Sequence, residues 1–227
     1  MNKIQSALEI LQSRIAHCAA SCGRNVDEIR WVAISKYATI EQIQQAYDCG
    51  IRVFGESKVL EALTKKSLLP RDVEWHFIGR IQSNKISKMI GQFSLIHSVA
   101  DVQVAKTLSV KSLEHGCIQP VLLQVNVVGD PHKQGFLPEQ ILVLWDELSS
   151  LAGIAIKGLM TIGPHTDNKQ SITSCFHGLA QLRHRLQSKG AVITELSMGM
   201  SQDFDIAIEQ NATWLRIGST LFSSSIQ

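Results

Sequence analysis

The lysine that follows a short apolar segment is the residue of this sequence best suited to covalent chemistry. Residues 31–35 (WVAIS) lead directly into Lys36. A short apolar run is typical of a strand buried on both faces, so we expect Lys36 to lie half desolvated at the rim of a core. Desolvation disfavours the ammonium form and favours the free amine, which can form a Schiff base with an aldehyde. The alternative interpretation is a lysine that only snorkels into solvent from a strand end.

Two glycine-containing segments near the end of the sequence are candidates for binding an oxyanion. They are residues 196–201 (LSMGMS) and 216–219 (RIGS). In β/α barrels, small loops after the last two strands bind phosphate through backbone N–H groups and hydroxyls. The serines and glycines of these segments are Ser197, Gly199, Ser201, Gly218 and Ser219. Ser201 also precedes a helix-like run and suits an N-cap position. Ordinary strand-to-helix turns are the alternative, but the two segments together favour phosphate binding.

Arg216 is the third residue that points to a ligand, because it lies two residues before Gly218. A guanidinium in a barrel mouth can bind an anion or donate to a ring nitrogen, and the alternative is an ion pair with Glu56 or Asp203. An amine for an aldehyde, a cup for a phosphate and a donor for a ring nitrogen together describe pyridoxal 5′-phosphate (PLP). Arginine keeps its proton, so the ring nitrogen would stay neutral and PLP would be a weak electron sink. That suits holding PLP, or racemisation, better than transamination.

Eight apolar segments that alternate with helical patterns must position these residues. The predicted strands are residues 31–36, 52–55, 74–78, 94–98, 120–126, 154–160, 192–197 and 213–217. The predicted helices are 39–49, 57–69, 82–90, 100–115, 138–151 and 168–189, with a weaker helical signal in 198–212 and an amphipathic helix at 2–20. This order predicts an α/β fold, a single (β/α)8 TIM-type barrel with an extra N-terminal helix. An open doubly wound sheet is the alternative, but its glycine-rich fingerprint is missing after the first strand.

Composition narrows the possible functions. The 227 residues suit one domain, spanning 1–227. The 22 basic and 20 acidic residues give a net charge of +2 without a basic block, so we expect no nucleic-acid partner. We expect no membrane association, since no apolar stretch approaches about 18 residues, and no signal peptide. Five scattered cysteines suit reduced thiols in a cytoplasmic protein, and we expect no metal site.

Taken in order, the motifs resemble the pyridoxal phosphate homeostasis proteins (the YggS/PROSC-like family) over nearly the whole sequence. The matching pieces are AISK at 33–36, FGE at 54–56, WHFIG at 75–79, QSNK at 82–85, IHS at 96–98, VN at 125–126, K-x-G at 133–135, GLM at 158–160, LSMGMS at 196–201 and RIG at 216–218. Ten ordered matches make the resemblance highly specific.

The resemblance implies a barrel like the N-terminal barrel of alanine racemase, with PLP held on Lys36 as an internal aldimine. It implies that Arg216 faces the ring nitrogen and that the loops at Ser201 and at Gly218 and Ser219 hold the phosphate. The cofactor-binding set predicted in this way is Lys36, Ser57, Met160, Ser197, Gly199, Met200, Ser201, Arg216, Gly218 and Ser219.

The resemblance also implies a role. Family members are thought to bind, buffer and hand on PLP, and to affect amino-acid and keto-acid balance, without an established catalytic turnover. We therefore expect PLP-dependent apo-enzymes as recipients, and a monomer or weak dimer.

The sequence departs from the family pattern at a few positions. Ser57 stands where the family usually has asparagine, Lys58 where it has an aromatic residue, and Arg80 where it often shows proline or histidine. Ser57 is shorter than asparagine, so it is expected to lose a contact near the cofactor ring. Ser219 replaces the usual threonine but keeps the hydroxyl.

A PLP-dependent amino-acid racemase is the alternative function. Enzymes of the alanine racemase type use a second base, usually a tyrosine from an added β-domain. The sequence has only Tyr37 and Tyr47. Tyr37 should point away from Lys36 in a strand, and Tyr47 falls on an outer helix. A two-base racemase is therefore disfavoured, whereas a one-base activity through Lys36 stays open.

A binding scaffold without a cofactor is the third possibility. Four polar residues would then be structural, namely His76, Asn84, Lys85 and His97. We expect the two histidines to be core groups in any case. Lys133 is either a secondary amine that relays PLP or a solvated loop lysine.

Overall fold

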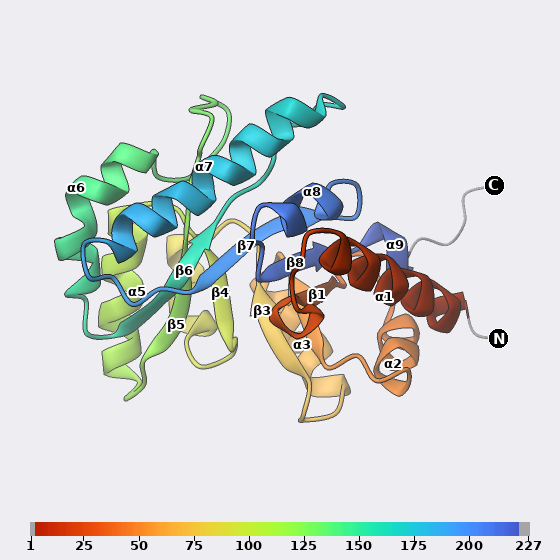
Figure 1. The fold of residues 1–227 in the computed structure, drawn as a ribbon. Helices are drawn as coiled ribbons and strands as arrows, with labels where there is room; N and C mark the ends of the chain where they lie inside the picture. The colour runs from red at the N-terminus through yellow and green to blue at the C-terminus, as the bar shows by residue number, and fades with distance from the viewer. Residues whose placement is uncertain (1–2, 223–227) are drawn as a thin grey trace.

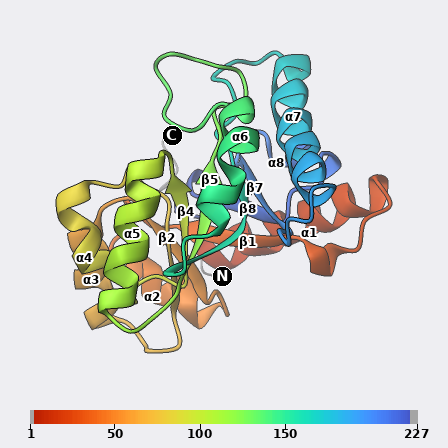
Figure 2. The same cartoon turned by 90° about the vertical axis from the view of Figure 1, so that its left-hand side faces the viewer.

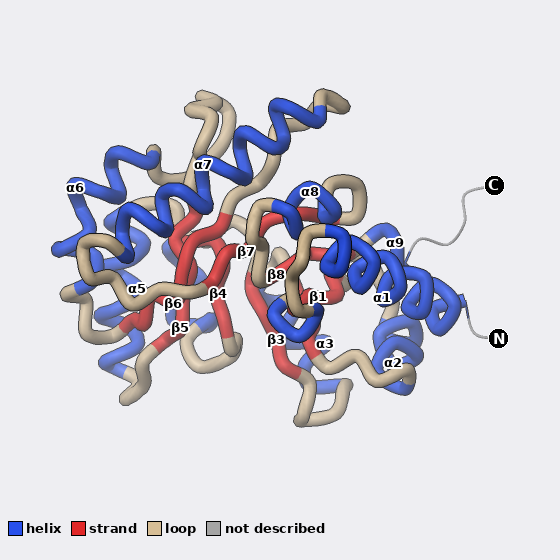
Figure 3. The backbone as a smooth tube through the Cα atoms, in the orientation of Figure 1, coloured by secondary structure: helices blue, strands red, loops and turns tan. Residues whose placement is uncertain are grey.

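Residues 3–222, which the computed structural model describes, form a closed barrel of eight parallel strands that pair in chain order (Figures 1 and 3). The strands are β1 Arg30–Ile34, β2 Val53–Glu56, β3 Glu74–Phe77, β4 Leu95–Val99, β5 Gln119–Gln124, β6 Ile154–Met160, β7 Glu195–Met200 and β8 Trp214–Ile217. The first strand pairs with the last, with Val32 opposite Arg216. The predicted (β/α)8 barrel is confirmed, and the open doubly wound sheet is excluded.

Helices surround the strands on the outside of the barrel (Figure 2). They are α1 Lys3–Ser21, α2 Ile40–Asp48, α3 Val59–Leu68, α4 Ile86–Met89, α5 Val102–Glu114, α6 Pro138–Ser149, α7 Lys169–Gln187, α8 Phe204–Glu209 and α9 Ser219–Phe222, with 3₁₀ turns η1 Val26–Glu28 and η2 Ser83–Lys85. The helix predicted at 82–90 is therefore two short pieces. The weak signal in 198–212 corresponds to the short helix α8. Among the described residues, no helix is both long and apolar enough to cross a membrane.

The predicted N-terminal helix packs on the barrel through one apolar stripe. Its buried residues recur three or four positions apart, and they are Ile4, Leu8, Leu11, Ile15 and Ala19. This stripe faces α2, α8 and α9. Arg14, on the outer edge of α1, pairs with Asp205 of α8 at 3.1 Å. Helix α1 thus packs against the helices that flank β1 and β8 in the chain.

The largest boundary error concerns β7, which was predicted at 192–197 and lies at Glu195–Met200. Apolar residues 191–193 suggested an earlier start, but Val192 is 93% exposed in the loop after α7. The strand pairs later in the sequence, with Ser197 opposite Trp214. The shift matters because it places Gly199 and Met200 within the strand rather than after it.

Strand β1 also differs from expectation, since it ends at Ile34 rather than at residue 36. The backbone N–H of Ala38 donates to Ser35 O at 2.9 Å and closes a turn. Thr39 then begins α2 with a capping box in which Gln42 is the partner. Lys36 therefore lies inside a turn between β1 and α2.

A buried ion pair holds the backbone just before Lys36. Lys65 of α3 reaches Glu56 at the end of β2, with 2.7 Å between Nζ and Oε1, and it also donates to Ser35 O at 2.7 Å. The Ser35 hydroxyl donates to the same carboxylate oxygen at 2.7 Å. Glu56 is fully buried. Side chains from two neighbouring elements thus hold the turn that carries Lys36.

The substitution Lys65→Met should destabilise the protein strongly, because it leaves the Glu56 carboxylate buried without a cation. Breaking a buried pair in this way costs about 3–5 kcal/mol of unfolding free energy. Urea denaturation without added ligand measures the loss. The matched control is Lys58→Met, which breaks the exposed Lys58–Glu61 pair of the same 2.7 Å length and should cost at most about 1 kcal/mol. Equal small losses in both variants would contradict the proposed clamp.

Candidate functional site

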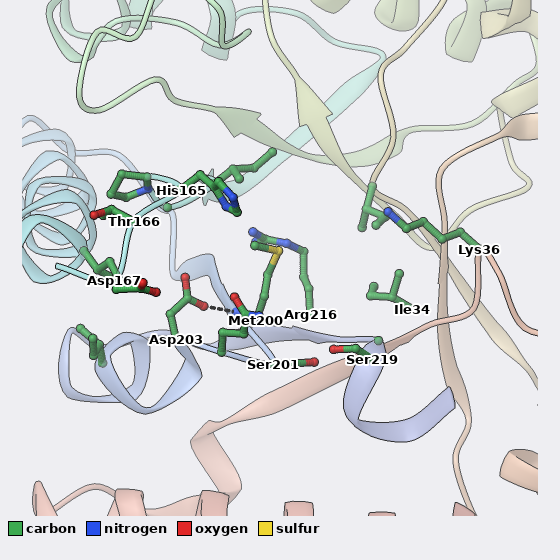
Figure 4. Close-up of a pocket in the computed structure, with 18 of the residues that line it drawn as sticks. Ile34, Lys36, His165, Thr166, Asp167, Met200, Ser201, Asp203, Arg216 and Ser219 are labelled. Atoms are coloured by element: carbon green, nitrogen blue, oxygen red, sulfur yellow. Dashed lines mark hydrogen bonds between the residues drawn. The ribbon is translucent and has the colours of Figure 1, made fainter. Parts of the chain in front are cut away.

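A cavity of about 910 Å³ opens where the strands end at their carboxyl termini. Its wall combines the turn after β1, the loop after β6, the end of β7 and the segment after β8 (Figure 4). Six of the predicted cofactor-binding residues line it, namely Lys36, Met200, Ser201, Arg216, Gly218 and Ser219. The barrel therefore brings together residues from both ends of the sequence in one cavity.

Lys36 extends from its turn toward the middle of the cavity (Figure 4). Lys36 is exposed, and the expectation of a half-desolvated amine is therefore wrong. The reason is that β1 ends at Ile34, two residues before Lys36. The expected position of Tyr37 is wrong for the same reason. In the turn, the Tyr37 ring lies beside Lys36, with 4.9 Å between Nζ and the ring centroid, and the tyrosine is 89% exposed.

Arg216 forms the floor of the cavity and is buried. Its Nη1 donates to Ser197 Oγ and its Nη2 to Thr161 O, each at 2.9 Å. Burial lowers the pKa of Arg216 to about 10, an effect that the negative charge of Asp203 partly opposes. The guanidinium therefore keeps its proton at neutral pH.

The alternative of an ion pair for Arg216 is wrong for both predicted partners. Glu56 pairs with Lys65 instead. Asp203 accepts from the backbone N–H of Met200 at 2.5 Å, and burial raises the pKa of its carboxyl group. Among residues 3–222, no carboxylate lies within ion-pair distance of Arg216. Its free N–H groups thus remain available to a ligand.

The hydroxyls of Ser201 and Ser219 point toward each other at the edge of the cavity (Figure 4). Ser201 Oγ accepts from the backbone N–H of Thr220 at 3.4 Å. The predicted N-cap role of Ser201 is wrong, because α8 begins at Phe204 and Asp203 occupies the cap position. Freed from that role, Ser201 joins Ser219 to form a small polar cup at the edge of the cavity.

Gly199 shapes the segment behind this cup. Its φ is +90°, which favours glycine, and an added Cβ would lie 2.5 Å from the Cβ of Ala207. The segment between β7 and α8 can therefore pack closely on that helix while Met200 and Ser201 face the cavity.

Four predicted cofactor-binding residues lie outside the lining of the cavity. Met160 is buried in an apolar cluster of the barrel interior, and Ser197 is buried beneath Arg216. Gly199 packs against Phe204 and Ala207 of α8. Ser57 is half-buried after β2. Its backbone lies close to Gly79, since a Cβ added to Gly79 would lie 2.0 Å from Ser57 O. Direct contacts of these four residues with a cofactor stay predictions.

The loop after β6 lines the side of the cavity opposite Lys36, and no single motif had indicated it. His165, Thr166 and Asp167 lie there (Figure 4). Lys133 holds this loop, since its Nζ donates to Gly163 O at 2.8 Å and to Ile162 O at 3.4 Å. Lys133 is half-buried and is not a freely solvated lysine. The glycine and proline after the GLM motif were the only available signal of a loop.

The donor set of this cavity fits a phosphorylated aromatic aldehyde. An amine, a buried cation and two facing hydroxyls converge on one space. His76 and His97, predicted as core groups, are fully buried in the barrel interior and do not line the cavity. Within the described part of the chain, no cluster of three or more histidine, cysteine or acidic residues could hold a metal ion.

Comparison with known proteins places this geometry in a family. The family model "Alanine racemase, N-terminal domain" matches residues 7–225. The pyridoxal phosphate homeostasis protein of Aquifex aeolicus (strain VF5) is 37% identical over 224 residues, which cover 98% of each chain. The structure of PipY from Synechococcus elongatus PCC7942 with PLP bound matches with a TM-score of 0.82 and 34% identity, over 92% of this chain and all of that one.

Alanine racemase of Clostridium difficile 630 shares the barrel alone. It matches with a TM-score of 0.80 at 13% identity, and the alignment covers all of this chain but 58% of the racemase. The expected likeness to the N-terminal barrel of alanine racemase is therefore confirmed at the level of the fold. Because its relatives at more than 30% identity over nearly the full length are homeostasis proteins, the chain belongs to the pyridoxal phosphate homeostasis protein family.

Proposed function

We propose that this protein binds PLP in the cavity at the carboxyl ends of the strands and serves to hold and deliver it, as one barrel domain. One observation carries the proposal: Lys36, Arg216 and the Ser201–Ser219 cup face the same space from three separate segments. PipY, at 34% identity, is a relative whose structure contains PLP. When bound, PLP would supply an aldehyde carbon for an amine and a ring able to stabilise negative charge.

Lys36, Arg216 and the two serines would each contact a different part of the ligand. The Lys36 amine lies where an aldehyde would be held covalently and reversibly. Two of the five N–H donors of Arg216 are used behind the cavity, so the others remain for the ring nitrogen. Since Arg216 stays protonated, it can donate to that nitrogen but does not transfer a proton to it. The two serine hydroxyls would donate to the phosphate.

The exposure of Lys36 supports a carrier rather than a closed catalytic site. A catalytic PLP site excludes water from the reacting bonds, whereas this lysine lies in an exposed turn at an open cavity. A ligand held there remains accessible to an incoming amine or a recipient protein. We propose PLP-dependent apo-enzymes as the recipients, with the protein acting inside the cell as a monomer or weak dimer.

Lys36→Ala should remove covalent PLP binding. Purified wild-type protein incubated with PLP should show the absorbance of lysine-bound PLP at about 420 nm, and borohydride reduction followed by peptide mapping should locate the label on Lys36. The control is Lys58→Ala, which removes an exposed lysine outside the cavity lining and should keep the band. A band that persists undiminished in Lys36→Ala would show that another lysine carries PLP.

The double substitution Ser201→Ala/Ser219→Ala should weaken PLP binding selectively. Each hydrogen bond to a charged group contributes about 1.5–3 kcal/mol, so the dissociation constant should rise at least about tenfold. Pyridoxal has no phosphate, and its affinity should stay unchanged. Fluorescence titration of both ligands measures the difference. An equal loss for PLP and pyridoxal would mean that the cup does not bind phosphate.

A racemase is the second candidate, because the Tyr37 ring lies beside Lys36 instead of pointing away. The carrier proposal predicts no sustained turnover when the PLP-loaded protein is incubated with each L-amino acid and the products are separated on a chiral column. Many turnovers per protein molecule, abolished by Tyr37→Phe, would establish the racemase instead.

A further inference from the structure

A line of buried hydrogen bonds crosses the barrel from the cavity to its opposite end. Arg216 Nη1 lies 2.9 Å from Ser197 Oγ, which lies 2.8 Å from His97 Nδ1. His97 Nε2 lies 3.0 Å from His76 Nδ1, and His76 Nε2 lies 3.1 Å from Glu74 Oε1. The four inner residues are at most 5% exposed, whereas the Glu74 side chain, at the start of β3, is 46% exposed. The line therefore connects the cavity floor to solvent at the far mouth.

The chemistry of Arg216 determines the direction of every bond in this line. A guanidinium only donates, so Ser197 Oγ accepts from it, and among the described residues His97 Nδ1 is the acceptor that lies within hydrogen-bond distance of the serine hydroxyl proton. A histidine that accepts at Nδ1 carries its proton on Nε2 and donates to His76 Nδ1. His76 then donates from Nε2 to the Glu74 carboxylate. In this arrangement each histidine accepts at Nδ1 and carries its proton on Nε2.

The surroundings keep His97 neutral. Burial is the main cause that holds the pKa of His97 well below its usual range; a proton added to His76 would lower it further, and the positive charge of Arg216 acts in the same direction. At the far end, the hydrogen bond from His76 lowers the pKa of the Glu74 carboxyl group. That carboxylate therefore stays ionised and keeps accepting from His76.

Trp214 packs beside the line, and charged residues lie near its two ends. The Trp214 ring meets His76 edge-on at 4.8 Å between centroids, and the Arg30 guanidinium stacks on the same ring at 4.2 Å. The ionisable groups that face the line or its ends are Arg30 from β1, Glu74 from β3, Glu195 from β7, Asp203 from α8 and Arg216 from β8. Arg30 and Glu195 pair with each other. None of these groups offers His97 a negative partner that would favour its charged form.

We propose that His97, supported by His76, is a positioning residue that acts through Ser197 to hold the Arg216 guanidinium against the ring nitrogen of the cofactor. The inference rests on the proposed function. If Ser197 had no acceptor for its own proton, its hydroxyl could rotate, and its lone pairs would turn away from Arg216. The acceptor nitrogen of His97 prevents that rotation. Thr161 O holds the second nitrogen, Nη2, so the guanidinium plane is set by two bonds on one edge.

This arrangement separates positioning from covalent attachment. Lys36 lies on a turn between β1 and α2, and it does not contact the line. Loss of His97 should therefore alter the contact with the ring nitrogen and leave covalent attachment to Lys36 intact. The prediction is specific for ligands that carry a ring nitrogen.

His97→Leu tests this directly, with His97→Asn as the matched variant. Asparagine can place an amide oxygen near the position of Nδ1 and accept from Ser197, whereas leucine cannot. His97→Leu should weaken PLP binding roughly tenfold, as expected for one lost hydrogen bond to a charged group, and His97→Asn should restore most of it. An analogue with carbon in place of the pyridine nitrogen should bind wild type and both variants alike. Equal losses for PLP and the analogue would reduce His97 to a structural role and overturn the proposal.

A second measurement uses the wild-type protein without ligand and does not depend on how the variants fold. Nitrogen-15 NMR of the histidine rings should show a neutral His97 with its proton on Nε2 at about pH 7. A proton on Nδ1 of His97, or a mixture of tautomers, would overturn the proposal. Failure of the wild-type protein to bind PLP would count against the proposed function. If the wild-type protein binds PLP and His97→Leu loses equal affinity for PLP and for the carbon analogue, the result would contradict only the role of His97.

Discussion

The pairing of β1 with β8 is the constraint on which the site depends. Parallel strands that close into a barrel end at the same mouth, so Val32 opposite Arg216 places the turn at Lys36 beside the turn at Gly218. The contact is close, since a Cβ on Gly218 would lie 3.3 Å from the Cβ of Ile34. An amine and a polar cup that are about 180 residues apart in sequence thus share one wall. Helix α1 packs on the outside against α2, α8 and α9, the helices next to these two strands in the chain.

The barrel interior contains a buried guanidinium, that of Arg216. Burying an unpaired cation costs far more than burying an apolar side chain, unless its donors find acceptors. Ser197 Oγ and Thr161 O accept hydrogen bonds from Arg216 on the side away from the cavity. No carboxylate among the described residues forms an ion pair with its guanidinium. The remaining N–H groups of Arg216 are therefore available to a ligand in the cavity. The same reasoning explains why polar side chains run through the barrel interior beside the apolar cluster that includes Leu122 and Met160.

Predictions from the sequence succeeded where a single element decides its own structure. The stripe of α1 and the strand at 154–160 follow from local hydrophobic periodicity, and the structure has both nearly as predicted. They failed where pairing with a neighbouring strand sets the bounds of an element. Val192 suits a strand as well as Leu196 does, and only pairing with β8 places β7 at Glu195–Met200. The partner of Glu56 is likewise a lysine on the next helix, Lys65, rather than the arginine that seemed plausible from charge alone.

The order of residue types along the chain was sufficient to indicate the barrel, the family and the amine, arginine and serines of the cavity, because periodicity and short motifs are local properties. Tertiary structure decided the rest. Lys36 lies in an exposed turn instead of at the end of a strand, and the Tyr37 ring lies beside it. Tertiary structure also joined His76 and His97 to Ser197 beneath Arg216. Those relations depend on strand register and on which way each side chain faces across a closed sheet, and no segment carries that information alone.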